Sequence, residues 1–293
     1  MSIPGVSRGE ERRGVIASLA PQPLRYRETA PITALAGYVQ SIWQLEGECR
    51  EASPRRIVPD GCMSLVVNFG APLEQVFEVG TAAWRARSLL IGEVRRPLVI
   101  QARGRVELLG VRFWPGAIGK FVVAPLAEIV DGLADESAFR TALARRISRT
   151  VCGAERADRL RLVQTALVEE LTGAPECDGL TREAALALLR SEGRIKIDGL
   201  AVALGVSRRT LERRFAVDVG IPAKSLASVL RFRRVLKAFE TSAVAWTDLA
   251  MDCGYYDQSH LIRDFKRFTG RAPRAYLLEA PSLSSLRIAS TER

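Results

Sequence analysis

Short apolar runs separated by turn residues dominate the chain from Tyr26 to about Val123. Their length and their β-branched and aromatic content are typical of strands. The predicted strands span 39–45, 64–69, 75–79, 88–92, 98–102 and 106–113. Pro59-Asp60-Gly61 predicts a turn, because proline presets φ and glycine accepts the left-handed position. Gly104 and Arg105 are expected to form a hairpin connection. The spacing predicts a β-barrel or sandwich.

The hydrophobic period changes after Pro125. Phe139, Leu143 and Ile147 lie four apart, and a 3-4-4 spacing follows from Leu160 through Val163 and Leu167 to Leu171. These patterns predict two amphipathic helices. We expect the helices to cover the barrel; the alternative is a dimer seam in which a narrow leucine stripe packs against its symmetry mate.

An internal near-repeat lies in the C-terminal third, where residues 198–215 can be laid over residues 248–265. The matched pairs are Leu200-Ala201 with Leu249-Ala250, Gly205 with Gly254, Leu211 with Leu261, and Phe215 with Phe265. Each copy predicts a helix, a tight glycine turn and a second helix, with Asp198, Ser207 and Asp257 as caps. The repeat therefore predicts two helix-turn-helix units joined by one long helix over 225–240.

Both second helices carry a polar face opposite their apolar face. The outward residues are Arg208, Arg209, Glu212 and Arg213 in the first unit, and Gln258, Ser259, Ile262 and Arg263 in the second. Arginine and glutamine suit bidentate contacts to guanine and adenine, glutamate can accept from cytosine, and isoleucine can touch a thymine methyl. These residues are the predicted base contacts, and Lys266 is a predicted phosphate contact. If both helices enter one face of the duplex, they lie about 34 Å apart.

Charge is concentrated in the same region. Residues 179–280 hold 18 Lys and Arg against 11 Asp and Glu, so most of the formal net charge of +10 lies there. A polyphosphate partner favours such an excess. Because the first unit holds more arginine, we expect it to contribute more of the affinity and the second unit to tune sequence preference.

Residues 198–277 resemble the DNA-binding domain of the AraC/XylS family of transcription regulators, through the segment DLAMDCGYYDQSHLIRDFKRFTGRAPRAY. Tyr255 stands where phenylalanine is commoner in that family. The resemblance implies a seven-helix domain with base contacts at the eight residues named above. Through YVQSIWQLEG, RIVPDGCMSLVVNFG and LLGVRFWPGA, the front half resembles the N-terminal domain of a subgroup of these regulators, which implies a cupin-like barrel.

The expected fold is therefore α+β, with a cupin-like β-barrel and its covering helices before an all-α domain. We predict a disordered tail over 1–24, a sensor or dimerisation domain over 25–172, and a linker over 173–180. The DNA-binding domain is expected over 181–280 and a loose tail over 281–293.

Candidate ligand contacts in the front domain are aromatic or charged: Trp43, Asp60, Trp84, Arg95, Arg112 and Trp114. The alternative is that these aromatic residues only fill the barrel core. The one histidine, His260, lies in the DNA-binding unit, so a histidine-based metal site in the barrel is excluded and no cofactor is expected. The five cysteines form no CxxC pair, which favours a reducing cytoplasm.

The predicted function is a bacterial, sequence-specific DNA-binding transcription regulator and activator, not an enzyme, controlled by a ligand or by dimerisation. Its expected partners are double-stranded DNA, RNA polymerase, a small-molecule effector and a second copy of the chain, with no membrane. The alternative is a DNA-directed alkyl-transfer repair enzyme that uses Cys49 or Cys62 as its nucleophile.

Overall fold

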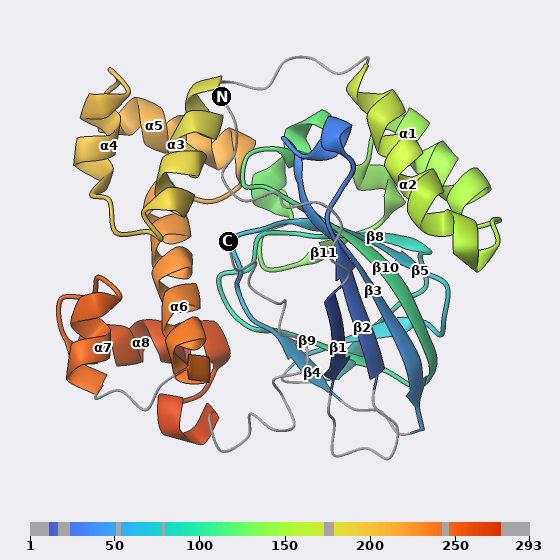
Figure 1. Ribbon diagram of the computed structural model, residues 1–293, viewed down its shortest axis with the longest axis horizontal. Helices are drawn as coiled ribbons and strands as arrows, with labels where there is room; N and C mark the ends of the chain where they lie inside the picture. The colour runs from blue at the N-terminus through green and yellow to red at the C-terminus, as the bar shows by residue number, and fades with distance from the viewer. Residues whose placement is uncertain are drawn as a thin grey trace.

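The computed structural model describes residues 12–16, 24–50, 54–77, 80–172, 179–241 and 246–276. A β-rich part comes first and a helical part follows beside it (Figure 1). The strands are β1 Arg12–Ile16, β2 Leu24–Thr29, β3 Val39–Cys49, β4 Arg55–Ile57, β5 Ser64–Asn68, β6 Leu73–Val76, β7 Thr81–Trp84, β8 Ser88–Ile91, β9 Leu98–Ala102, β10 Gly104–Phe113 and β11 Leu133–Ala134. The predicted α+β class is confirmed.

Two antiparallel sheets make up the β-rich part. The larger sheet has the order β1-β2-β3-β10-β5-β8-β11 and the smaller one β4-β9-β6-β7. The two longest strands, β3 and β10, pair from Cys49 and Gly104 to Val39 and Phe113, with a register shift near the end. The predicted barrel thus takes the form of two sheets, and no ladder joins them among the described strands.

The hairpin prediction at Gly104 is wrong. β9 belongs to the smaller sheet and β10 to the larger one, so the chain changes sheet at this point. Gly104 has a φ of 86°. A residue without Cβ reaches this conformation at little cost, which allows a sharp corner in place of a hairpin turn.

Most predicted strands are confirmed, but the short or polar ones escaped prediction. β4 holds two arginines among its three residues, and β7 is mostly exposed. The prediction of a disordered tail over 1–24 is wrong at β1, because Arg12–Ile16 pairs antiparallel with β2. The rest of that range, apart from Leu24 at the start of β2, lies outside the described residues.

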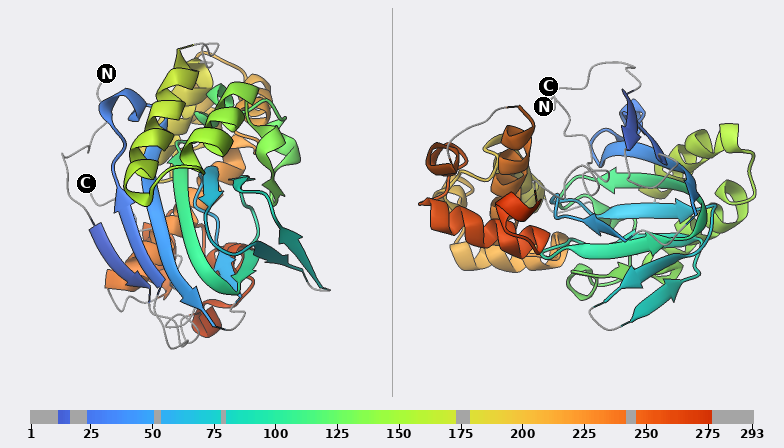
Figure 2. Two further views of the ribbon diagram at one scale, coloured as in Figure 1. Left: turned by 90° about the vertical axis from the view of Figure 1, so that its right-hand side faces the viewer. Right: turned by 90° about the horizontal axis from the view of Figure 1, so that it is seen from below.

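Helices cover the larger sheet, as predicted (Figure 2). They are α1 Thr141–Arg146, the π-helical η5 Ile147–Val151 and α2 Arg156–Leu171, and the 3-10 turns of this part are η1 Thr33–Leu35, η2 Ile118–Lys120, η3 Leu126–Glu128 and η4 Glu136–Ala138. Leu143, Ile147, Val163 and Leu167 are fully buried in one cluster with the sheet residues Leu65 and Val111. The leucine stripe therefore packs against the sheet of the same chain.

The helical part contains α3 Gly179–Arg190, α4 Ile197–Ala203, α5 Arg208–Asp218, α6 Ala223–Thr241, α7 Trp246–Asp252 and α8 Gln258–Thr269. It has two apolar cores, and α6 contributes to both. Leu226 and Leu230 pack in the core around α3 to α5, and Phe232 and Val235 pack in the core around α7 and α8. The long helix predicted over 225–240 is confirmed. The predicted tail over 281–293 and most of the predicted linker lie outside the described residues.

Within the described ranges, no helix combines the length and the apolar character that crossing a membrane requires.

Candidate nucleic-acid interface and ligand pocket

The first helix-turn-helix unit consists of α4 and α5. Gly205 has a φ of 68°, and Ser207 caps α5 by accepting a hydrogen bond from the Thr210 amide at 3.1 Å. Both features confirm the sequence prediction. The predicted cap at Asp198 is wrong, since Lys196 occupies the N-cap position of α4 and the Asp198 carboxylate pairs with Arg208 at 3.1 Å.

The second unit consists of α7 and α8. Gly254 has a φ of 80°, and Asp257 caps α8 by accepting from the His260 amide at 2.7 Å. Leu261, Phe265 and Phe268 are buried, as the repeat predicts. The His260 ring stands edge-on to the Tyr255 ring, with 5.1 Å between centroids, which gives this histidine a packing role.

The predicted base contacts differ in solvent exposure. Most of them are exposed, and so is the predicted phosphate contact: Arg208, Arg209, Arg213, Gln258, Ser259, Arg263 and Lys266. Glu212 is half-buried, and its carboxylate accepts a hydrogen bond from the Ala223 amide at 3.0 Å, at the start of α6. Ile262 is also half-buried and packs against the second apolar core.

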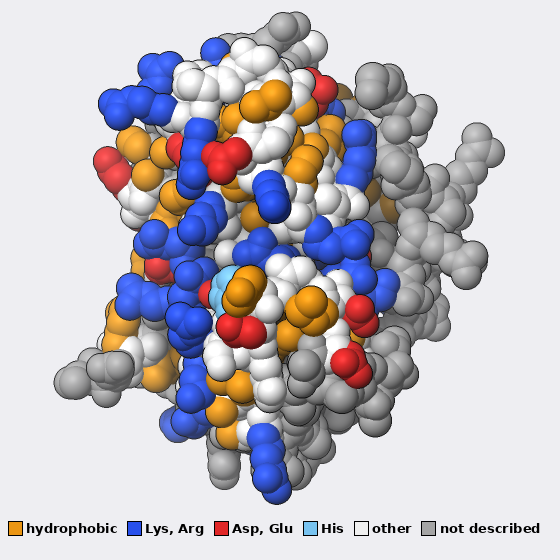
Figure 3. Space-filling view, turned by 90° about the vertical axis from the view of Figure 1, so that its left-hand side faces the viewer, with side chains coloured by type: hydrophobic (Ala, Val, Ile, Leu, Met, Phe, Trp, Pro, Cys, Tyr) orange, Lys and Arg blue, Asp and Glu red, His pale blue; other side chains and the backbone are white. Residues whose placement is uncertain are grey.

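Basic side chains gather on the face of the molecule that carries the helical domain. Figure 3 shows Lys and Arg side chains in a band that runs the length of this face and passes the pale-blue histidine. Because the chain has one histidine, that colour marks His260 and hence helix α8. A basic band beside the second helix of a helix-turn-helix unit suits a nucleic-acid backbone.

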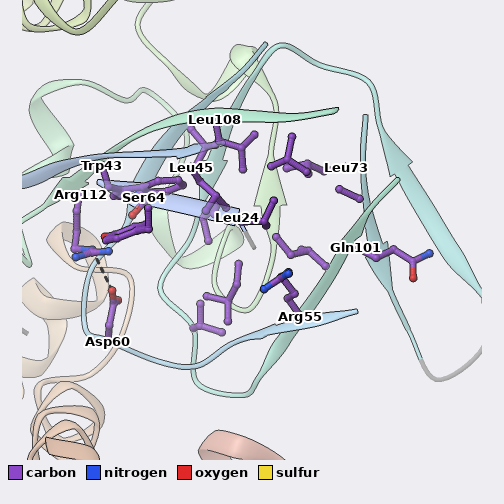
Figure 4. Close-up of a pocket in the computed structure, with 18 of the residues that line it drawn as sticks. Leu24, Trp43, Leu45, Arg55, Asp60, Ser64, Leu73, Gln101, Leu108 and Arg112 are labelled. Atoms are coloured by element: carbon purple, nitrogen blue, oxygen red, sulfur yellow. Dashed lines mark ion pairs between the residues drawn. The ribbon is translucent and has the colours of Figure 1, made fainter. Parts of the chain in front are cut away.

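A second candidate site is a cavity of about 70 Å³ between the two sheets. Its wall is mostly apolar and comes from both sheets: Leu24, Tyr26, Trp43, Leu45, Cys49, Ile57, Val66, Leu73, Ile91, Val94, Ile100, Ala102, Val106 and Leu108. Six polar residues complete it: Arg55, Asp60, Cys62, Ser64, Gln101 and Arg112. Arg112 and Asp60 form an ion pair at one end, and Gln101 lies at the other (Figure 4).

Arg112 is the most buried charged group of the cavity wall, with 2% of its side chain exposed. Its Nη1 donates to Glu28 at 3.1 Å and to Ser41 at 3.4 Å, and its Nε lies 3.3 Å from an Asp60 oxygen. Burial alone lowers the pKa of Arg112, but the neighbouring Asp60, Tyr26 and Glu28 raise it, and the net pKa is raised. The guanidinium is therefore charged inside the fold.

The structure brings together three of the six candidate ligand contacts: Trp43 from β3, Asp60 from the turn and Arg112 from β10. The other three do not line the cavity. Trp84 packs against the surrounding apolar cluster, Arg95 pairs with Asp131 at the surface, and Trp114 donates to the Ala36 carbonyl. Sequence reasoning missed Arg55 and Gln101, which lie on β4 and β9 of the smaller sheet.

Cys62 also lines the cavity, and its thiol donates to the Gln40 side chain at 3.2 Å. Burial, followed by the charge of Asp60, raises the pKa of Cys62 well above its usual value. Burial likewise raises the pKa of Glu93, again with Asp60 as the next contributor. Cys62 is therefore a neutral thiol near pH 7.

The turn that holds Asp60 also contacts the helical domain. Arg233 of α6 donates to the Asp60 backbone carbonyl at 3.0 Å. At Gly61, an added Cβ would lie 3.0 Å from Leu226 of the same helix, so the turn fits closely against α6. One residue, Asp60, thus presents its carboxylate to the cavity and its carbonyl to the helix that joins the two helix-turn-helix units.

Comparison with known families finds two separate matches in the chain. Residues 200–279 match a helix-turn-helix domain, and residues 27–135 match a domain of unknown function (DUF6597). No curated protein matches the chain.

Several solved structures are similar to it. ToxT from Vibrio cholerae is 10% identical over 81% of this chain and 97% of its own, with a TM-score of 0.43. The DNA-binding domain of AdpA, solved in complex with a target DNA, is 25% identical over 35% of this chain and 94% of its own, with a TM-score of 0.33. The C-terminal domain of AraT from Geobacillus stearothermophilus is 21% identical over 34% of this chain and 84% of its own, with a TM-score of 0.32.

The repeated helix-turn-helix units and the family match define the class of this protein as a DNA-binding transcriptional regulator. Its C-terminal domain is an AraC-type helix-turn-helix domain, which follows an antiparallel β domain in the sequence. The resemblance drawn from the sequence of the C-terminal residues is thereby confirmed.

Proposed function

We propose that α5 and α8 enter successive major-groove segments of one DNA site, and that the occupant of the β-domain cavity controls this binding. The exposed Arg209, Arg213, Gln258, Ser259 and Arg263 are the base contacts in this proposal, and Lys266 contacts phosphate. Their exposure on the two capped helices supports the assignment.

Asp60 is the observation that carries the proposed control. A group that binds in the cavity beside Arg112 also meets the Asp60 carboxylate, 3.3 Å from Arg112 Nε. A shift of this turn changes the contact of Asp60 with Arg233 and the packing of Gly61 on Leu226. Because α6 contributes to both apolar cores, such a shift is transmitted to both helix-turn-helix units.

Sequence-specific binding is tested by measuring affinities for genomic fragments and for random duplex at one fixed salt concentration. We expect a subset of fragments to bind at least about a thousandfold more tightly than random duplex. Equal affinity for every fragment and for random duplex would contradict sequence-specific regulation.

Control through the cavity is tested with a double-mutant cycle on operator affinity. Ala102→Leu fills part of the cavity, and Arg233→Gln removes the bond to Asp60. We expect Ala102→Leu to change operator affinity in the native background. In the Arg233→Gln background, the same substitution should leave operator affinity unchanged. Arg161→Gln, at an exposed ion pair on α2, serves as the charge-matched control that leaves the Ala102→Leu effect intact. The same effect in all backgrounds, or none in any, would exclude this route.

The proposal assigns the protein no enzymatic activity. Burial raises the pKa of Cys62, Cys152 and Cys253, and a neutral thiol is a poor nucleophile. The raised pKa of Cys62, one of the two cysteines named as nucleophile in the enzyme hypothesis, supports a regulator over an alkyl-transfer enzyme. Intact mass after incubation with alkylated DNA checks this point, since a methyl group on Cys49 or Cys62 would revive the enzyme hypothesis.

A cytoplasmic location follows from the proposed role, because the operator lies there. RNA polymerase and a second copy of the chain remain predicted partners.

A further inference from the structure

The Arg112 end of the cavity holds hydrogen-bond donors that no described residue uses. Arg112 lines the cavity with 2% of its side chain exposed, and its Nη2 has no hydrogen-bond partner among the described residues. Its Nε contacts Asp60 at 3.3 Å without a hydrogen bond. A buried donor without an acceptor is costly, and an acceptor group on a bound ligand would remove that cost.

The charges around Arg112 restrict what kind of acceptor fits. Glu28, 3.1 Å from Nη1, and Asp60, 3.3 Å from Nε, already set two carboxylates against one guanidinium. Tyr26 keeps its proton and donates it to the second Glu28 oxygen at 3.1 Å. A third carboxylate at Nη2 would face both acidic groups in a buried setting, where like charges repel strongly. An uncharged oxygen meets the donor without that repulsion.

The remaining wall favours a compact apolar body. The remaining wall residues are chiefly aliphatic, as those labelled in Figure 4 show, and Tyr26 and Trp43 are the two aromatic ones. The cavity of about 70 Å³ has room for roughly five water-sized groups at about 10–15 Å³ each. Such a space suits a small ring or a short chain.

We propose that the cavity binds an uncharged, mainly apolar small molecule, whose single carbonyl or hydroxyl oxygen accepts a hydrogen bond from Arg112 Nη2. This inference deepens the proposed control by a cavity occupant and rests on it. Placed there, the oxygen also adjoins Asp60, the residue that contacts α6.

Three isosteric probes test the ligand class on the full chain. Acetone carries a neutral acceptor, isobutene replaces that oxygen with a methylene group, and acetate carries a full negative charge. Dissociation constants are measured by NMR titration, with thermal unfolding as the check on folding. A hydrogen bond to a charged group predicts roughly tenfold tighter binding of acetone than of isobutene. Acetate is expected to bind more weakly than acetone.

Variants identify the anchor. Arg112→Lys keeps the charge but loses the planar donors, so acetone binding should fall to the isobutene level. Arg95→Lys, at a surface ion pair outside the cavity, should leave all three constants unchanged. If Arg112→Lys does not fold, Ala102→Leu replaces it and should weaken the two neutral probes equally, because it narrows the cavity.

Each alternative result overturns a stated part of the proposal. Equal binding of acetone and isobutene would remove Arg112 as the anchor. Tightest binding of acetate, lost on Arg55→Gln, would assign an anion site to Arg55. If no probe binds, or if Ala102→Leu changes no constant, the ligand class is wrong. The operator-affinity cycle of Ala102→Leu and Arg233→Gln is measured without any probe, so it reports separately on the proposed control.

Discussion

In the first helix-turn-helix unit, two of the four predicted contact side chains are bound to neighbours within the domain. Arg208 pairs with Asp198, and Glu212 accepts the Ala223 amide at the start of α6. In the second unit, Gln258, Ser259 and Arg263 are exposed, and Ile262 is the one drawn toward the core. The first unit contains more arginine than the second. Because Arg208 and Glu212 are bound within the domain, however, it offers fewer unpaired polar side chains to DNA than its sequence indicates.

The two units also differ in their attachment to the β domain. At Gly220, just after α5, an added Cβ would lie 3.0 Å from the Leu126 carbonyl of η3, and Val130 packs on the first core. The second unit meets the β domain through Val58 and, at Gly270, through Pro97. The two helix-turn-helix units thus contact the β domain through different residues, and α6 is the element that the units share.

The largest expected effect comes from deleting the central aromatic side chain of each unit. Phe215→Ala and Phe265→Ala each remove a fully buried ring, which costs about 3–5 kcal/mol of unfolding free energy. Since α6 runs through both cores, each variant should lower one shared transition in guanidinium unfolding. A separate early transition confined to one unit would show that the units are independent.

Base recognition comes next in size. Arg209→Ala and Arg263→Ala should each cost about 1–3 kcal/mol of operator affinity, concentrated at one base position. Lys266→Ala should weaken binding to all sequences alike and reduce the salt slope by about 1. Affinity measured over a panel of single-base operator variants separates the two behaviours, and a uniform loss for Arg209→Ala would remove it from the base contacts.

The turn glycines sharpen the comparison further. Gly205→Ala and Gly254→Ala both force a side chain into the left-handed region, at about 1–2 kcal/mol. Gly254→Ala should cost more, because its Cβ would lie 3.0 Å from Arg194 and 3.3 Å from Arg231, whereas the space at Gly205 is open. Urea unfolding of the two variants gives the order directly, and equal losses would mean that the arginines move aside freely.

The smallest effect distinguishes a structural role of Glu212 from base recognition. Glu212→Ala removes the acceptor for the Ala223 amide and should lower the unfolding free energy by about 1 kcal/mol. Ser259→Ala, at an exposed position of α8, is the control and should leave stability unchanged. A loss of discrimination at a cytosine without a loss of stability would return Glu212 to the base contacts.

The features that sequence predicted well are those fixed by local chemistry. Ser207 and Asp257 cap their helices, and Gly205 and Gly254 make the turns, because each depends only on residues a few positions away. Asp198 and Gly104 were misread because a partner outside the segment decided their roles: Arg208 in one case and a second sheet in the other.

The cavity shows the same limit more clearly. Trp43, Asp60 and Arg112 come from two strands and a turn, and the pairing of β10 with both β3 and β5 brings them to one wall. Residue type alone suggested Trp84, Arg95 and Trp114 equally well, and it gave no sign that Asp131 would hold Arg95 at the surface. Nor could it show that Asp60 contacts α6.

The central claim is that both units read one DNA site together. In vitro selection of binding sites with the native chain, Arg209→Ala and Arg263→Ala tests it most directly. We predict that the two variants lose base preference in two separate blocks, about 10 base pairs apart, while the rest of the site is retained. Loss of the same positions in both variants, or of none in one of them, would contradict a paired reader.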